Sequence, residues 1–193
     1  MGMEAKRVAL PHIKQDQKLP TVLSQQEVKR LLKAPKYLKH RLILATLYGC
    51  GLRSYELCNL KLSDVDFERQ TVFIPKKKGK VDRYVPLSEH LARGLRKYIE
   101  TENPHHYLFN SQKTDSGSPR GLTTSGIRWV IKENRSKIGS SKKITAHMLR
   151  HSFATHLLEY GVDIVSLKEL LGHAHIEDPA LFARCQPANR CQI

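Results

Sequence analysis

Apolar residues recur at helical spacing through most of this chain. The first segment opens with S-Q-Q-E at Ser24–Glu27, a capping box that predicts a helix up to about Ala34, and Pro35 ends it. The same spacing predicts further helices at His40–Cys50, Leu52–Leu60, Ser88–Glu102, Thr123–Ser136, Thr145–Tyr160 and Ile164–Leu171. Each helix should turn its apolar face to a shared core, and Trp129 is expected in that core.

The period changes from helical to alternating between residues 64 and 87. Asp64–Pro75 alternates apolar and polar positions, as a half-buried strand does, and Arg83–Leu87 repeats that pattern. Between them lies a basic turn with Gly79 near its centre, so the unit predicts a β-hairpin with a K-K-K-G-K tip. The fold class is therefore mainly α with a small antiparallel β-sheet (α+β).

Charge narrows the class of partner. The 193 residues include 33 Lys and Arg against 18 Asp and Glu, a formal net charge of +15. A folded chain this basic usually binds a polyanion, so nucleic acid is the leading candidate and an anionic membrane surface the second. A merely soluble basic protein is the third alternative. No run of 18 apolar residues and no secretory signal is present, which predicts no membrane crossing and a cytoplasmic location.

A set of cationic side chains suggests chemistry on a phosphate. His147 and Arg150 are three residues apart on one predicted helix, so they should share a face. His173 follows a helix that ends in L-L-G, and Arg53 lies far upstream. Arginine grips two phosphate oxygens with a planar fork, and histidine can move a proton near neutral pH. No Asp and Glu cluster with magnesium-ligand spacing occurs, so we expect no metal and no cofactor.

Four motifs together resemble the catalytic domain of the tyrosine recombinase (phage integrase) family. They are G-C-G-L-R-S-Y-E-L, R-Y-V-P-L, H-M-L-R-H-S-F-A-T-H-L and L-L-G-H-A-H-I, and the resemblance spans roughly residues 19–182. It implies a DNA-breaking and rejoining domain at 21–182, preceded by a linker or arm at 1–20 and followed by a tail at 183–193. It also implies site-specific DNA recombination and integration in a prokaryotic, nucleoid-associated setting.

The resemblance assigns roles to five residues of the site. It implies that Arg53 and Arg150 clamp the scissile phosphate, with His147 beside them as a proton acceptor or phosphate donor. His173 matches a second imidazole that donates to a phosphate oxygen. Glu56 matches an acid that supports the first arginine.

The lysines of the hairpin tip complete the implied site. Lys78 matches the lysine that protonates the departing 5′ oxygen, although Lys77 and Lys80 are close enough to compete for this assignment. Lys76, Lys77, Lys80 and Arg83 are expected to contact DNA.

The position of the expected nucleophile holds Phe182. In the family, a tyrosine nine residues after the second histidine attacks phosphorus, and phenylalanine has no hydroxyl with which to do so. Three explanations stay open: a Tyr→Phe change made to trap an uncleaved state, a naturally inactive relative, and a nucleophile donated by another subunit. The last is the weakest, since an identical donor chain also lacks the tyrosine. The alternative function is a recombinase-like DNA-binding module without chemistry.

Two features of the family bear on assembly. Family members carry an N-terminal helical domain that closes around DNA, and only about twenty residues precede the first predicted helix here. The chain is therefore expected to be an isolated catalytic domain or one half of a DNA clamp. Relatives form a tetramer on DNA by exchanging a final helix, and the short polar segment 183–193 leaves such self-association open.

Overall fold

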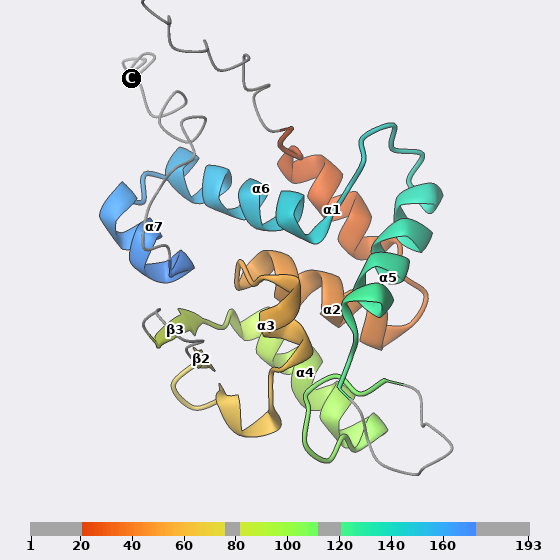
Figure 1. The fold of residues 1–193 in the computed structure, drawn as a ribbon, viewed down its shortest axis with the longest axis vertical. Helices are drawn as coiled ribbons and strands as arrows, with labels where there is room; N and C mark the ends of the chain where they lie inside the picture. Colours follow the sequence, from red (N-terminus) through yellow and green to blue (C-terminus); the bar gives the residue numbers. More distant parts are fainter. Residues whose placement is uncertain (1–20, 76–81, 112–120, 173–193) are drawn as a thin grey trace, which may run out of the picture.

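The computed structural model of this chain describes residues 21–75, 82–111 and 121–172. The elements run in the order α1 (Gln25–Lys33), α2 (Leu38–Gly49), α3 (Ser54–Cys58), a 3-10 turn η1 (Leu62–Asp64), β1 (Val65–Asp66), β2 (Thr71–Ile74), β3 (Arg83–Pro86), α4 (Glu89–Glu102), α5 (Thr124–Lys137), α6 (Ala146–Glu159) and α7 (Ile164–Leu171). The predicted class, mainly helical with a small antiparallel sheet, is confirmed (Figure 1). The predicted arm at 1–20 and tail at 183–193 lie outside the described residues.

Five of the seven predicted helices begin behind a side-chain cap, whereas α2 begins two residues before its predicted start and α3 two residues after. Ser24 accepts a hydrogen bond from the backbone N–H of Glu27, whose side chain accepts one from the N–H of Ser24. This reciprocal pairing satisfies two donors that an α-helix leaves free at its first turn. Four later helices begin behind single capping side chains, those of Ser88, Thr123, Thr145 and Asp163.

The sheet has three strands, where the sequence pattern predicted two. The predicted strand over residues 64–75 is two strands, β1 and β2, joined by a turn, and the sheet order is β1-β2-β3 with antiparallel pairing. The Asp66 side chain accepts from the N–H groups of Glu68 and Arg69, and Gln70 takes a left-handed conformation with φ of 51°. An Asp that bonds the backbone two and three residues ahead favours a turn over a continuous strand, which the alternation of apolar residues did not reveal.

The core gathers around α2, which contacts α1, α3, α4, α5 and α6. Figure 1 shows α2 in the middle of the molecule, with α6 on one side of it and α4 on the other. Its apolar residues are buried around much of its circumference, as expected for a helix enclosed by others. A second, smaller cluster of buried residues joins α6 to α7: Phe153, Ala154, Leu167 and Leu171.

Gly51 lets the chain pass close to α6 just before the start of α3. Its φ is +58°, and a Cβ at this position would lie 2.6 Å from the ring of Phe153. A side chain here would be strained by its backbone and by the ring at once. The close approach brings the carbonyl group of Gly51 to the helix that carries Arg150.

Trp129 is not in the core, so that expectation is wrong. It is 56% exposed, whereas Ile127 and Ile131 on the same helix are buried. A residue two positions away on an α-helix points to roughly the opposite side, so Trp129 could not share the buried face of both isoleucines. Its ring instead packs edge-on against His40, with ring centroids 5.5 Å apart.

Candidate functional site

One carboxylate, that of Glu56, lies at the centre of the candidate site. Arg53 precedes the short helix α3, and Glu56 occupies its first turn. The Glu56 carboxylate accepts the backbone N–H of Arg53 at 2.8 Å and its side-chain Nη1 at 3.0 Å. The three-residue spacing lets one acid close the helix start and orient the guanidinium. The Arg53 side chain stays 31% exposed, so it can reach a ligand from solvent.

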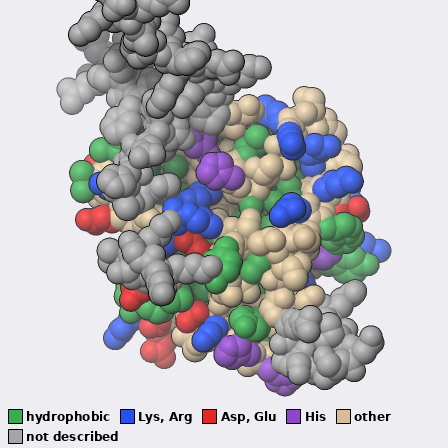
Figure 2. Space-filling view, in the orientation of Figure 1, with side chains coloured by type: hydrophobic (Ala, Val, Ile, Leu, Met, Phe, Trp, Pro, Cys, Tyr) green, Lys and Arg blue, Asp and Glu red, His purple; other side chains and the backbone are tan. Residues whose placement is uncertain are grey.

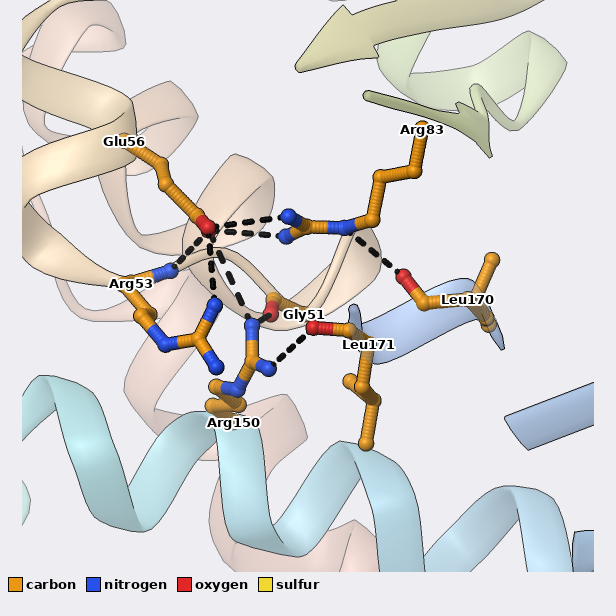
Figure 3. Close-up of polar contacts among 7 residues, drawn as sticks. All are labelled: Gly51, Arg53, Glu56, Arg83, Arg150, Leu170 and Leu171. Atoms are coloured by element: carbon orange, nitrogen blue, oxygen red, sulfur yellow. Dashed lines mark hydrogen bonds and ion pairs between the residues drawn. The ribbon is translucent and has the colours of Figure 1, made fainter. Parts of the chain in front are cut away.

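Arg150 approaches the same carboxylate from α6. Its Nη1 lies 3.7 Å from Oε2 of Glu56 and donates to the carbonyl oxygen of Gly51 at 2.6 Å. Its Nη2 donates to the carbonyl oxygen of Leu171 at 2.5 Å (Figure 3). The residue is only 3% exposed, so its guanidinium is held by protein acceptors on two sides. The structure thus brings together the two arginines that are almost one hundred residues apart in the sequence.

Arg83 is a third arginine at this carboxylate. It begins β3 and donates from Nη1 and Nη2 to the two carboxylate oxygens of Glu56, at 2.9 and 2.8 Å. Its Nε donates to the carbonyl oxygen of Leu170 at 2.9 Å. With its side chain 10% exposed, Arg83 forms a buried ion pair. The expected DNA contact of Arg83 stays a prediction, and the contacts of its guanidinium in this structure are with protein.

One acid facing three arginines leaves an excess of positive charge, which shifts the pKa values of the cluster. Burial by itself would raise the pKa of Glu56, but the hydrogen bonds from Arg83 and from the backbone of Arg53 outweigh it and lower that pKa to about 2. Burial, followed by the charge of Arg53, lowers the pKa of Arg150 to about 9, although Glu56 opposes the shift. An anion bound beside Arg53 and Arg150 would relieve this repulsion.

His147 lies in the first turn of α6, and its side chain is exposed. Arg150 follows on the same helix, so the predicted placement of both on one element is confirmed. The helix begins at Thr145, whose hydroxyl accepts the N–H of Met148. The structure thus places an exposed imidazole in the first turn of the helix that also carries Arg150.

Six of the expected site residues lie outside the described residues. They are Lys76, Lys77, Lys78, Lys80, His173 and Phe182. The roles of these residues, and those of Arg53, Glu56, His147 and Arg150 in a reaction, stay predictions. Within the described ranges, no group of three or more His, Cys, Asp and Glu side chains could hold a metal ion.

A second basic surface lies over α5 and the loop that leads into α6. Arg128, Lys132, Arg135 and Lys143 line a cavity of about 280 Å³ whose apolar wall includes Ile131 and Ile144. On the face seen in Figure 2, Lys and Arg side chains gather over this region and again near the middle of the molecule, where acidic and His side chains join them. Sequence reasoning missed this surface, although the i, i+4 and i+7 spacing of Arg128, Lys132 and Arg135 was a readable signal.

Sequence reasoning also missed the part that Arg83 and three backbone carbonyl groups play in the cluster. Backbone acceptors at Gly51, Leu170 and Leu171 leave no trace in residue identity. In the sequence, Arg83 is only one more cation beside a basic turn.

In the part of the chain that the structure describes, no helix is long and apolar enough to cross a membrane.

Comparison with known proteins agrees with this geometry. Residues 21–186 match the model of the phage integrase family. The chain is 39% identical over 187 residues to tyrosine recombinase XerA of Thermococcus onnurineus, covering 94% of this chain and 63% of that protein. It is 38% identical over 182 residues to a putative integrase/recombinase, y4qK, of Sinorhizobium fredii, covering 94% and 58%. The chain thus spans less than two thirds of the length of these relatives.

Solved structures give the same family. A crystal structure of XerA recombinase superposes with a TM-score of 0.77 at 32% identity, covering 91% of this chain and 62% of that one. The XerH site-specific recombinase bound to its difH substrate superposes with a TM-score of 0.70 at 29% identity, covering 86% and 51%. With a family match over most of its length and a shared fold, this chain belongs to the phage integrase family and is a catalytic domain of the tyrosine recombinase type.

Proposed function

We propose that residues 21–182 bind double-stranded DNA and hold one backbone phosphate for metal-free strand exchange. The observation that carries the proposal is the convergence of Arg53 and Arg150 on a single carboxylate with positive charge in excess. A guanidinium group stays charged at working pH and can hold two phosphate oxygens at once. The exposed side of Arg53 and the exposed His147 face the solvent from which DNA would arrive.

The reaction class is transesterification through a 3′-phosphotyrosine. A tyrosine oxygen would bond to phosphorus while the bond from phosphorus to the 5′ oxygen breaks, and the leaving oxygen would take a proton from Lys78. Arg53 and Arg150 would stabilise the extra negative charge on the phosphoryl oxygens as the fifth bond forms. His147 would accept the tyrosine proton, and His173 would donate to a phosphoryl oxygen.

Phe182 makes this chain a binding domain whose cleavage is disabled. Its ring fills the volume of a tyrosine without the hydroxyl that forms the covalent bond. A second candidate function follows from the same residue: a module that occupies DNA sites and does no chemistry. The two functions share the phosphate site and differ in whether the remaining groups still support cleavage once a tyrosine is present.

The basic surface over α5 supports DNA as the partner. Its four cations border the loop that leads into α6, the helix that carries His147 and Arg150. A duplex lying across both regions would neutralise several phosphates and release their counterions. Lys76, Lys77 and Lys80 would add contacts at the hairpin tip. Tetramer formation on DNA, and a place at the DNA of a prokaryotic cytoplasm, belong to the same proposal.

The test restores the nucleophile. DNA duplexes retained by the chain as it stands are first selected from a randomised pool, and the selected sequence is then nicked so that cleavage cannot be reversed. The Phe182→Tyr variant is expected to form a covalent adduct with this substrate, which denaturing gels resolve. The unchanged chain serves as the matched control. Binding without any adduct in the Phe182→Tyr variant would reject the enzyme scaffold and support the DNA-binding module.

A further inference from the structure

We propose that Arg83 is a positioning residue of the phosphate site, fixing the carboxylate of Glu56 and the end of α7 relative to each other. The inference rests on the proposed function, because it concerns how Arg53 and Arg150 are kept aimed at one phosphate. It assigns to Arg83 a role inside the protein, in contrast to the direct DNA contact expected from its place beside a basic turn.

All three nitrogens of the Arg83 guanidinium donate to protein acceptors. Two of them hold the two oxygens of Glu56 in a bidentate pair, and Nε holds the carbonyl oxygen of Leu170 (Figure 3). The planar fork fixes the rotation of the carboxylate as well as its position. Glu56 is then presented in one orientation to Arg53 and Arg150, which would repel each other without it.

The end of α7 is held between two arginines. The carbonyl groups of a helix's last turn have no partner within the helix, and here Arg83 binds that of Leu170 while Arg150 binds that of Leu171. Gly172 then turns the chain with φ of 61°, and a Cβ there would lie 3.1 Å from Arg83. The point at which the chain leaves α7 toward His173 is therefore set by the same groups that hold Glu56.

Arg83 also places the sheet in this network. It pairs with Ile74 at the end of the β2–β3 ladder, next to the connection that carries Lys78 in the sequence. One side chain thus links β3, α3 and α7. Lysine could supply the positive charge but neither the bidentate pair nor the third hydrogen bond, so the geometry requires arginine itself.

The test measures cleavage by Arg83→Lys and Arg83→Gln in the Phe182→Tyr background. Arg69→Lys is the matched control, because Arg69 lies on the β1–β2 turn with its side chain 86% exposed. Single-turnover adduct formation on the nicked duplex is expected to fall about 100-fold in Arg83→Lys, as expected for a misplacement of about 1 Å. The DNA affinity of the same variant should stay within about twofold, and its salt dependence should not change.

A substrate with altered charge separates positioning from general loss of structure. A methylphosphonate at the scissile position replaces one charged phosphoryl oxygen by a methyl group, so less charge remains for Arg53 and Arg150 to stabilise. The loss caused by Arg83→Lys is expected to shrink to less than about tenfold on this substrate. An equal loss on both substrates together with a lower melting temperature would overturn the proposal, as would full activity of both variants. Weaker DNA binding with a flatter salt response would show a direct DNA contact instead.

A readout without DNA separates this proposal from the proposed function. If the Phe182→Tyr parent forms no adduct, the proposed function is rejected. The positioning role of Arg83 is then tested by its effect on the pKa of Glu56 alone. Titration of the Glu56 carboxyl carbon by NMR should then show a higher pKa in Arg83→Gln than in the unchanged chain, with no change in Arg69→Lys. An unchanged Glu56 titration would overturn the role of Arg83.

Discussion

Arg83 and Glu56 form a bidentate ion pair, with nitrogen-to-oxygen distances of 2.9 and 2.8 Å, that joins the sheet to the helix carrying the candidate site. Both side chains are largely buried, at 10% and 13% exposed. A buried carboxylate that loses its charge leaves its arginine partners uncompensated. The pair therefore contributes to stability and to the shape of the site at once.

Glu56→Gln should destabilise the fold in a pH-dependent way. The folded pKa of Glu56, about 2, is below its ordinary value of 4.5, so its charge contributes stability that is complete above about pH 4.5 and is lost as pH falls toward 2. At pH 7 the loss should be on the order of 3 kcal/mol, since each pKa unit corresponds to about 1.4 kcal/mol. Denaturant unfolding at several pH values measures the free energy of unfolding of the unchanged chain and of Glu56→Gln. The difference between these two free energies should become smaller below pH 4.5.

Glu133→Gln is the control for that experiment. Glu133 also pairs with a cation, Lys137 at 3.0 Å, but both side chains are 43% exposed. Exposed pairs of this kind contribute little, so the change should cost less than about 0.5 kcal/mol. Equal effects of the two substitutions would contradict the central place of Glu56.

Arg150→Ala should separate phosphate chemistry from DNA affinity. Arg150 is almost fully buried and supplies one positive charge among many, so DNA affinity should fall modestly, whereas the adduct formed in the Phe182→Tyr background should become undetectable. Losing one positioned group that stabilises transition-state charge typically costs a factor of about 10² to 10³. Gel-resolved adduct yield and fluorescence anisotropy measure the two quantities. A normal adduct yield would remove Arg150 from the site.

DNA affinity should fall steeply as salt rises. Each phosphate neutralised by a lysine or arginine adds roughly 0.9 to the slope of log affinity against log salt. Lys132→Ala, on the basic cavity over α5, should lower that slope by about one. Lys97→Ala, an exposed lysine of α4 outside that cavity, should leave it unchanged. Equal slopes for all three proteins would contradict a DNA contact through α5.

Gly172→Ala should destabilise the fold more than Gly139→Ala. Both glycines have φ of 61°, so both substitutions carry the left-handed penalty of roughly 1–2 kcal/mol. Only at Gly172 would the new Cβ approach Arg83, at 3.1 Å, while nothing lies within 4 Å at Gly139. Arg83 cannot move aside without lengthening its hydrogen bonds to Glu56 and Leu170. Chemical denaturation of the two variants measures the difference, and equal losses would show that Arg83 yields freely.

Local features of the fold could be predicted from the sequence better than contacts between distant segments. The capping box at Ser24–Glu27 and the helix stop at Gly172 are local, and both predictions are confirmed. The split of the first strand depends on the side chain of Asp66 bonding the backbone ahead of it, which an alternating pattern hides.

The candidate site was predictable where residue type sufficed. Arg53 and Arg150 were singled out by their motifs, and the structure places them at one carboxylate. The contacts of Arg83 were not predictable, because its acceptors include a main-chain oxygen at Leu170, 87 residues away. Pairing across that distance follows from how α7 packs, and no local pattern encodes it.

The small separate cluster under α7 has a consequence for motion. Among the described residues its buried members are Phe153, Ala154, Leu167 and Leu171, whereas the main core takes buried residues from six helices and the sheet. Elements with few buried contacts open first in native-state hydrogen exchange, so the amides of α7 should exchange ahead of those of α2. The hydrogen bonds from Arg83 and Arg150 to the last carbonyl groups of α7 then oppose the local unfolding of this helix. A bound phosphate that fixes the side chain of Arg150 would slow the hydrogen exchange of the α7 amides.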